Sequence, residues 1–342
     1  GAVNSDLFAA PVLKCVIIAH DGTVFAGTQG RRGMAKIRRM LEVAEQGHLP
    51  VVVYAEGGGA RSGEHGVNEG PTTSLWTLAS RLSGLVPLVG VVNGRCFAGN
   101  AGLLGVCDVI IATNGSNLGM GGPAMVEGGG LGIVAPEDIG PTSVQFPNGV
   151  IDVLVEDEAS ATAAAKRYLS YFQGPTLPWE CADQRLLRSV VPENRVRAYD
   201  MRRVIELLAD TGSVLELRAG FGAAMLTALI RIEGRPAGVI ANNPLVLSGA
   251  LDADGSDKAA RFMQLCDAFD LPIISLCDTP GTMVGPETER TAILRHSSRM
   301  FLVGSNLTIP VMNIVLRKRT GLGAAAMQPP SIFNATWPTG EF

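Results

Sequence analysis

An internal duplication constrains the fold of this chain more than any other feature of its sequence. Residues 16–20 (Val-Ile-Ile-Ala-His) are matched by residues 238–242 (Gly-Val-Ile-Ala-Asn), 222 positions later. A spacing of 222 or 223 also relates Leu49-Pro50 to Leu271-Pro272, Glu56 to Asp278, Gly59 to Gly281, Gly63 to Gly285, Pro87 to Pro310, and residues 98–101 to 321–324. A repeat maintained over about a hundred residues predicts two copies of one folding unit.

Apolar strand-like runs alternate with helical patterns in both copies. The first copy predicts strands at 12–19, 50–55, 87–92 and 107–113, loops at 57–63 and 94–99, and helices from 34 to a C-cap at Gly47 and at 72–83, 100–106 and 159–171. The second copy predicts strands at 237–241, 272–277 and 309–316, loops at 278–285 and 317–323, and helices at 257–269 and 287–303, after an ordered segment at 196–232. This alternation is typical of α/β units with right-handed crossovers.

The chain is long enough for two domains of ordinary size. Pro175, Pro178 and Pro192 lie within residues 174–195, which we predict to be a linker between halves at 1–173 and 196–342. The two copies have unequal ends. We therefore expect either that the natural domain continues beyond both ends of this sequence or that the ends of the copies have diverged.

The overall composition argues against several classes of protein. The formal net charge is −4, from 28 basic and 32 acidic residues, which does not suit a broad nucleic-acid or membrane-binding surface. The apolar runs are strand-sized, and from the first residues of the sequence we expect no signal peptide. The six cysteines form no C-x-x-C pair and the four histidines show no ligand spacing, so we expect reduced thiols, no metal site and a cytoplasmic protein.

A glycine-rich loop is predicted between a strand and a helix in each copy. In the first copy this loop contains Gly99 and Asn100, and in the second it contains Leu322 and Gly323. The first N–H groups of a helix lack internal partners and favour negative charge, so each pair of backbone donors could hold an oxyanion. A single loop of this kind is better explained as a tight turn between a strand and a helix, but its recurrence at the equivalent place favours a functional role.

A further loop in each copy follows a buried strand, where α/β proteins bind their ligands. The first-copy loop contains Gly57, Gly58, Gly59, Ala60 and Arg61, and the second-copy loop contains Pro280 and Gly281. We expect a further glycine-rich segment near the first loop, at Gly121, Gly122 and Pro123, to form another wall of the candidate site. Basic residues at the start of one predicted helix form either a phosphate site for a nucleotide-like ligand or a solvated face: Arg31, Arg32, Lys36, Arg38 and Arg39.

These motifs together resemble the carboxyltransferase component of biotin-dependent acyl-CoA carboxylases, in the crotonase superfamily. The resemblance covers nearly the whole chain, and its most specific pieces are residues 21–27, 57–63, 96–101, 121–123, 221–222, 240–243, 280–285 and 337–338. Residues 321–327 and 337–342 look most like the single-chain, multidomain long-chain acyl-CoA carboxylases. The fold that the resemblance implies is α/β, with two tandem crotonase-like (ClpP/crotonase) β-β-α superhelical units.

The resemblance also implies a role for each half. The N-terminal half would bind acyl-CoA, and the C-terminal half of a neighbouring subunit would bind carboxybiotin, in a homo-oligomer built as a dimer of trimers. Gly99-Asn100 and Leu322-Gly323 would form two oxyanion holes, one for the acyl enolate and one for the ureido oxygen of biotin, while Ala325 would line the acyl pocket. The base would come from the cofactor. A biotin carboxyl carrier domain and a biotin carboxylase would be the partners, on the same chain or on separate subunits.

The sequence departs from the family pattern in two places. Family members usually carry Gly-Gly where this chain has Gly99-Asn100, so the side chain either narrows the site or adds a hydrogen bond. The chain is also shorter than family members between Met327 and Pro329. Two other functions stay open: the carboxyltransferase subunit of a biotin-dependent decarboxylase sodium pump, and a non-catalytic scaffold paralogue. A simple hydratase is disfavoured, because it needs only one copy of the unit.

Overall fold

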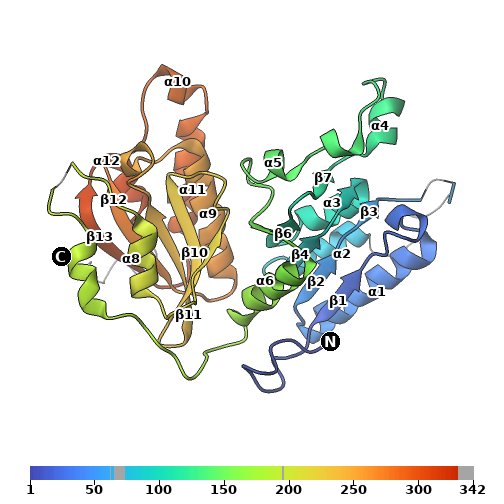
Figure 1. Ribbon diagram of the computed structural model, residues 1–342, viewed down its shortest axis with the longest axis horizontal. Coiled ribbons are helices and arrows are strands. Elements are labelled where there is room, and N and C mark those ends of the chain that lie inside the picture. The colour runs from blue at the N-terminus through green and yellow to red at the C-terminus, as the bar shows by residue number, and fades with distance from the viewer. Residues whose placement is uncertain (62, 65–73, 195, 330–342) are drawn as a thin grey trace. The chain divides into compact units, whose positions relative to one another are not determined.

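The computed structural model describes residues 1–61, 63–64, 74–194 and 196–329. The chain divides into two compact units, Gly1–Gln173 and Gly174–Phe342 (Figure 1). The stretch at 174–194 belongs to the second unit and contains η3 (Gln184–Leu186) and α7 (Leu187–Val190). Leu187 and Val190 of this stretch pack against the hydrophobic core of that unit.

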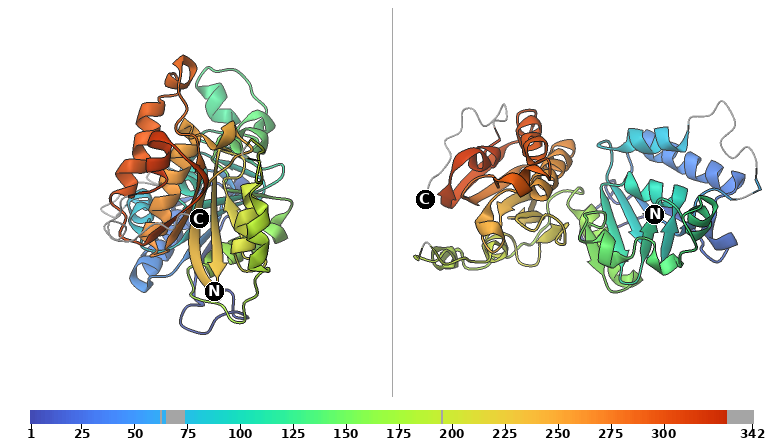
Figure 2. Two further views of the ribbon diagram at one scale, coloured as in Figure 1. Left: turned by 90° about the vertical axis from the view of Figure 1, so that its left-hand side faces the viewer. Right: turned by 90° about the horizontal axis from the view of Figure 1, so that it is seen from above.

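The first unit is built on a parallel sheet in the order β1-β2-β4-β6-β8. Its strands are β1 (Val16–Ala19), β2 (Val51–Tyr54), β4 (Leu88–Val92), β6 (Val109–Thr113) and β8 (Val153–Val155). Val51, Val89 and Val91 are fully buried, as expected of β-branched residues in strands covered on both faces. The sheet lies between α1 (Arg31–Gly47) and α2 (Leu75–Leu82) on one side and α6 (Glu158–Ser170) on the other (Figure 2).

The second unit repeats three adjacent strands of this sheet, β1, β2 and β4. Its order is β13-β12-β11-β10-β9, in which β11 (Arg235–Asn242), β12 (Ile273–Thr279) and β13 (Val311–Arg319) are parallel. The paired residues correspond by the repeat spacing: Val16 with Val51 and Gly238 with Ile273, then Val51 with Leu88 and Ile273 with Val311. The prediction that the copies share one strand arrangement is confirmed down to the register.

The ordered segment predicted at 196–232 consists of α8 (Met201–Leu208), β9 (Leu215–Leu217) and β10 (Met225–Ile232). β10 pairs antiparallel with both β9 and β11, so the second sheet is mixed rather than purely parallel. A two-residue turn joins β10 to β11. Its residues, Glu233 and Gly234, both have positive φ (51° and 76°), which matches the right-handed twist of a hairpin.

The loops predicted at 57–63 and 94–99 are partly wrong, because some of their residues form strands of a small parallel sheet in the first unit. It consists of β3 (Gly57–Gly58), β5 (Arg95–Phe97) and β7 (Asn117–Gly119), in that order. Strands this short leave no periodic pattern in the sequence. Short elements follow them in the chain: α4 (Pro123–Gly128), η2 (Pro136–Asp138) and α5 (Thr142–Gln145).

Several predicted boundaries are also wrong. Helix α1 runs through Gly47, and its C-cap is His48 in the left-handed conformation. The single helix predicted at 287–303 is two helices, α10 (Pro286–Glu289) and α11 (Ile293–Gly304), because Ala292 adopts a positive φ of 55°. Helix α9 (Ala253–Ala268) begins earlier than residue 257, since the Asp252 side chain caps the Gly255 N–H. Strand β1 starts at Val16 rather than residue 12, and β13 continues to Arg319.

Candidate active site

A cavity of about 950 Å³ opens in the first unit beside the ends of β1, β2 and β5. Helix α3 (Ala98–Gly105) begins two residues earlier than predicted, so Gly99 and Asn100 lie in its first turn. The predicted site residues that line the cavity are Gly57, Gly58, Gly59, Ala60, Gly99, Asn100, Gly122 and Pro123. Apolar side chains complete much of the wall, among them Met34, Ile37, Leu75, Trp76 and Phe97. Such a cavity suits a largely apolar small molecule.

Gly59 lies directly against the start of α3. A Cβ atom added to Gly59 would lie 2.6 Å from the backbone nitrogen of Gly99, so any larger residue would displace this donor. The Gly59 carbonyl oxygen accepts a hydrogen bond from the Gln29 N–H (2.7 Å), and its own N–H donates to Phe97 (3.2 Å). Close approach of two backbones is therefore the reason for glycine at position 59.

The Asn100 side chain is buried and turned toward backbone carbonyl groups. Its Nδ2 donates to the carbonyl oxygen of Gly27 (3.0 Å) and to that of Glu56 (2.7 Å). These bonds tie α3 to η1 (Phe25–Gly27) and to the end of β2. Of the two effects expected of an asparagine here, the structure shows the added hydrogen bonds.

Arg61 and Gly121 were predicted in the site but do not line the cavity. The Arg61 guanidinium lies 4.3 Å from the ring centre of Phe25, pairs with Glu64 at 3.0 Å and donates to the Thr28 carbonyl oxygen at 3.1 Å. It thus braces the chain that passes from η1 to α1. Ser62, next in the same predicted loop, and residues 337–342 of the resemblance lie outside the described residues.

Two titratable side chains that the sequence analysis did not place in the site also line the cavity, Glu56 and His20. Burial raises the pKa of Glu56, and repulsion from Glu158 raises it further. The 2.8 Å hydrogen bond from the Asn93 N–H acts in the opposite direction. Burial lowers the pKa of His20, only partly offset by the Glu56 backbone, which favours a neutral ring. The repeat could have indicated these two positions, because His20 corresponds to Asn242 and Glu56 corresponds to Asp278 in the second copy.

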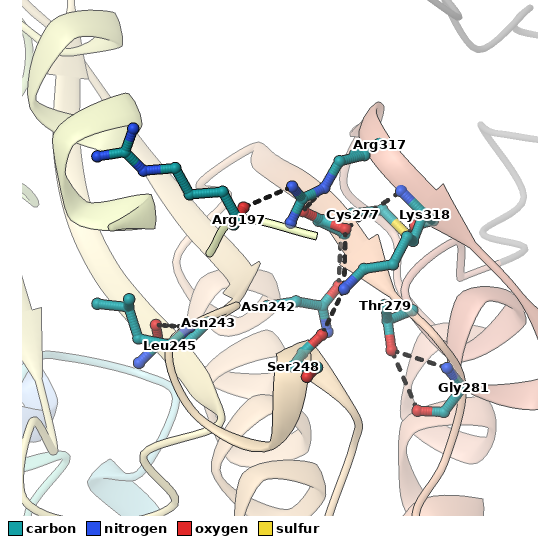
Figure 3. Close-up of polar contacts among 11 residues, drawn as sticks. Arg197, Asn242, Asn243, Leu245, Ser248, Cys277, Thr279, Gly281, Arg317 and Lys318 are labelled. Atoms are coloured by element: carbon teal, nitrogen blue, oxygen red, sulfur yellow. Dashed lines mark hydrogen bonds and ion pairs between the residues drawn. The ribbon is translucent and has the colours of Figure 1, made fainter. Parts of the chain in front are cut away.

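The equivalent loop of the second unit has the same construction. Helix α12 (Gly321–Ala326) places Leu322 and Gly323 in its first turn. A Cβ atom added to Gly323 would lie 2.5 Å from the carbonyl carbon of Gly281, so these two backbones also touch. The hydroxyl of Thr279, which precedes Pro280, bonds both the N–H and the carbonyl oxygen of Gly281 at 3.1 Å (Figure 3). Ala325 is exposed on this helix, whereas Ala324 and Ala326 are buried.

Backbone contacts around the two loops also repeat. The Gln29 N–H donates to the Gly59 carbonyl oxygen, and the Leu251 N–H donates to that of Gly281 at 3.0 Å. Residues in the left-handed conformation recur in η1 and in η4 (Leu247–Gly249). A Cβ atom on Gly27 would lie 2.6 Å from the Glu56 carbonyl oxygen, and one on Gly249 would lie 2.3 Å from that of Asp278. The structure therefore builds one loop arrangement twice.

Asp278 has no exposed surface and lies between two cations that the sequence analysis did not assign to it. Its Oδ2 accepts from Arg317 Nε (3.2 Å), and its Oδ1 accepts from the Lys318 N–H (3.2 Å) with Lys318 Nζ at 3.5 Å. Arg317 also donates to the carbonyl oxygen of Arg197 (2.8 Å), and Lys318 Nζ donates to that of Ser248 (2.7 Å) (Figure 3). The cluster holds the strand that leads into α12.

The remaining candidate features lie apart from the cavity wall. The basic cluster of α1 contributes none of its cations to the wall, although Met34 and Ile37 of the same helix do, so a phosphate site there stays a prediction. All six cysteines are free, with five buried and Cys181 exposed. Across the described residues, no cluster of His, Cys, Asp or Glu could hold a metal ion, and no helix has the length and apolarity to cross a membrane.

Comparison with known proteins assigns this duplicated architecture to a family. Residues 13–342 match the family model described as the carboxyl transferase domain. The chain belongs to the carboxyl transferase domain family. A solved single-chain, multi-domain long-chain acyl-CoA carboxylase superposes on this carboxyl transferase domain with a TM-score of 0.92 at 52% identity, covering 96% of this chain and 33% of that chain. The α/β fold of the crotonase type is thereby confirmed.

Curated relatives of this carboxyl transferase domain are subunits of larger enzymes. The biotin-dependent long chain acyl-coenzyme A carboxylase beta4 subunit of Mycobacterium tuberculosis is 32% identical over 345 residues, 95% of this chain and 65% of the relative. The methylmalonyl-CoA carboxyltransferase 12S subunit of Propionibacterium freudenreichii is 32% identical over 320 residues, 90% and 61% respectively. A transcarboxylase 12S crystal structure with methylmalonyl-CoA bound has a TM-score of 0.80 at 31% identity, over 91% of this chain and 63% of that chain. The chain thus spans less than two thirds of these relatives' length.

Proposed function

We propose that this chain is the carboxyltransferase part of a biotin-dependent acyl-CoA carboxylase, which moves a carboxyl group from carboxybiotin to the α-carbon of an acyl-CoA. The observation that carries the proposal is a close backbone contact in each unit, Gly59 with Gly99 and Gly281 with Gly323, each beside the first turn of a helix. Two such backbone sites suit a transfer between two carbonyl-containing ligands. The family and the names of its relatives support the same chemistry.

The first unit supplies the acyl-CoA site in this proposal. The N–H groups of Gly99 and Asn100 bind the thioester oxygen as it becomes an enolate, and each fixed donor of this kind lowers the barrier by about 2.7–4 kcal/mol. Gly57, Gly58, Ala60, Gly122 and Pro123 form the wall, and Arg61 and Gly121 support it from outside the cavity. The apolar side chains around Phe97 fit the uncharged part of the substrate.

The second unit supplies the biotin site. The close contact of Gly281 with Gly323 fixes the loop against the first turn of α12, whose main-chain N–H groups would hold a flat ureido group. Leu322 and Gly323 offer those donors, with Pro280 and Gly281 opposite them and Ala325 exposed at the rim, where it would meet an acyl chain. When bound, carboxybiotin supplies both the carbon dioxide and the base, so the chain itself contributes orientation and oxyanion binding.

The proposal includes partners and a location. A biotin carboxyl carrier domain and a biotin carboxylase deliver the carboxyl group, and the chain assembles into a dimer of trimers in the cytoplasm. A hexamer assembly described for the 12S relative supports the oligomer. Exposed apolar side chains on α11 and α12, Leu294 and Leu322, offer surface for a subunit contact. Light scattering of the native protein should give a mass well above that of a monomer.

The test is carboxylation by the native full-length protein. We expect ATP-dependent transfer of labelled bicarbonate carbon to acyl-CoA when biotin carboxylase and biotinylated carrier are present. Sodium-coupled decarboxylation without ATP would instead identify the pump subunit. Activity that appears only after addition of a paralogue, and that survives loss of the Gly99 donor, would identify a scaffold.

A further inference from the structure

The repeat places one carboxylate at the same position in each half, directly beside the loop that carries the glycine donors. Glu56 follows β2, and Asp278 lies near the end of β12, 222 positions later. In the mechanism proposed above neither carboxylate has a role, because the base comes from the cofactor. Both are nevertheless buried or half-buried in places where an ionised group is costly.

Glu56 contacts both the segment before α3 and α3 itself. Its Oε1 accepts from the Asn93 N–H at 2.8 Å, and its carbonyl oxygen accepts from the Asn100 amide at 2.7 Å. A Cβ atom on Gly94, which has φ of +151°, would lie 2.9 Å from Oε2, so the carboxylate is pressed against the backbone there. The two residues that precede β5 and the second donor of α3 are thus held by one residue.

Asp278 makes the corresponding contacts in the second unit with different chemistry. It accepts the Lys318 N–H, on the strand that leads into α12, and it pairs with the side chains of Arg317 and Lys318. Its own N–H donates to Asn242 Oδ1 at 3.1 Å, which fixes it to β11 (Figure 3). Asp278 therefore links three neighbouring strands: it lies in β12, its N–H contacts β11, and its carboxylate contacts β13.

We infer that Glu56 and Asp278 are positioning residues, one for each oxyanion hole, which set the distance between the glycine loop and the first turn of the following helix. The inference rests on the proposed function and adds to it the residues that hold each hole open for its own ligand. Because each carboxylate contacts only its own half among the described residues, loss of one should affect one ligand. A 1 Å misplacement of a reacting group costs on the order of 100-fold in rate.

The test uses the native full-length protein in the reverse reaction, with a carboxylated acyl-CoA and free biotin as separate substrates. Glu56→Leu removes the acceptor of the Asn93 N–H, whereas Glu56→Gln keeps an oxygen there. Asp278→Asn keeps the shape but turns an amide toward Arg317. Exposed Glu193, in residues 174–194, gives the control variant Glu193→Leu. Circular dichroism and light scattering check the fold and assembly of each variant, and Glu56→Asp, one methylene shorter, replaces Glu56→Leu if the latter misfolds.

We expect Glu56→Leu to lower kcat/KM for the acyl-CoA by roughly 100-fold while KM for biotin stays unchanged, with most of the loss restored in Glu56→Gln. Asp278→Asn should lower kcat/KM for biotin while KM for the acyl-CoA stays unchanged. Equal loss of kcat/KM for both ligands, or folded variants with wild-type kinetics, would overturn the inference and leave the proposed function intact. If Glu56→Leu affected biotin and Asp278→Asn affected the acyl-CoA, positioning would be supported, but the assignment of ligands to halves would be overturned.

Calorimetric binding of biotin and of an acyl-CoA ketone analogue, in which CH2 replaces the thioester sulfur and the carbonyl oxygen is kept, gives a readout apart from turnover. If the wild-type protein transfers no carboxyl group, the proposed function fails, and the binding data still decide the inference. A weakened complex with the ketone analogue in Glu56→Leu alone supports positioning. Unchanged binding of both ligands in all variants contradicts it.

Discussion

The side-chain amide of Asn100 donates a 2.7 Å hydrogen bond to the main-chain oxygen of Glu56, and this bond joins the first turn of α3 to the end of β2. The same amide holds the Gly27 carbonyl oxygen at 3.0 Å. A departure from the family's Gly-Gly pattern thus acts as a cross-link between two loops. The oxyanion donor that we propose for residue 100 is its backbone N–H, which takes no part in these side-chain hydrogen bonds.

Asn100→Ala should destabilise the protein while leaving that backbone N–H in place. The variant removes two hydrogen bonds of a buried amide, although the Gly27 carbonyl oxygen keeps the Gln29 amide at 3.2 Å, and we expect a loss of about 1–3 kcal/mol in the free energy of unfolding. Turnover should fall because the proposed oxyanion hole loses the side-chain hydrogen bonds that fix the first turn of α3. Urea denaturation and steady-state kinetics measure the two effects, with exposed Asn114→Ala as the control. Equal stability of the two variants would show that the cross-link has no energetic role.

Gly99→Pro should reduce kcat by about 10²–10³-fold, because proline removes one oxyanion donor. The matched control is Gly99→Ala, since a Cβ there would lie 3.4 Å from Gly59 Cα, an ordinary contact, and the N–H is kept. Proline is tolerated in the first turn of a helix, but its ring would lie close to Gly59, so circular dichroism and urea denaturation must show that the variant keeps its fold. A folded proline variant with the turnover of the alanine variant would refute the donor role of Gly99.

The second loop needs a different substitution. Gly323→Ala would place its Cβ 2.5 Å from the Gly281 backbone, so it should destabilise the protein whatever its effect on chemistry. Leu322 has an exposed side chain and lies in the same first turn. Leu322→Pro compared with Leu322→Ala therefore isolates the donor, and a large difference in turnover between the two is expected.

Ala325→Ile should shift the preference of the enzyme toward short acyl chains. In the proposed function this position lines the acyl pocket. Ala325 is the exposed member of three consecutive alanines, so added volume would project outward from α12. A filled pocket rejects extra methylene groups sterically. Relative kcat/KM for acetyl-, propionyl- and palmitoyl-CoA measures the effect, with Ala325→Ser as a small control. The same proportional loss for all three substrates would exclude a role for Ala325 in chain-length selection.

Lys258 should make stability depend on pH in the alkaline range. The side chain is buried and donates to the carbonyl oxygens of Arg218 (2.8 Å) and Phe221 (2.9 Å), and burial lowers its pKa to about 8. Between pH 8 and the pKa of the unfolded lysine, the unfolded chain holds more protons, so the unfolding free energy rises with pH by up to about 1.4 kcal/mol per unit.

Denaturation of wild-type protein and Lys258→Met at a series of pH values checks this sign. The difference in unfolding free energy between them should grow in favour of the wild type as the pH rises above 8. Exposed Lys166→Met should show no such trend. A pH-independent difference would mean that Lys258 titrates normally in the folded protein.

The duplication determined in advance how the strands shared by the two copies are arranged. Because the positions from Val16 to Pro50 and from Gly238 to Pro272 are spaced equally, equivalent residues pair in both sheets. The correspondence of Gly59 with Gly281, and of Gly99-Asn100 with Leu322-Gly323, followed for the same reason. Insertions in a buried parallel sheet would reverse the faces of its side chains, so the repeat spacing preserves register.

Other features arose only from tertiary contacts. The β3-β5-β7 sheet is made of two- and three-residue strands, which are stable only because three separate segments meet. The break at Ala292 falls in a sequence with ordinary helix formers, so local propensity gives no reason for it. Local patterns report the period of a segment and not what it packs against.

The polar contacts around each proposed oxyanion hole were also determined partly by the sequence and partly by tertiary contacts. Sequence spacing identified Glu56 and Asp278 as equivalent, but their environments differ: Asp278 lies between Arg317 and Lys318, whereas Glu56 holds the Asn93 N–H and repels Glu158. The sequence alone determined that two similar loops exist and which glycines they contain. Only the tertiary structure decided which side chains hold them, because a hydrogen bond of about 3 Å depends on where separate strands and helices bring their atoms together.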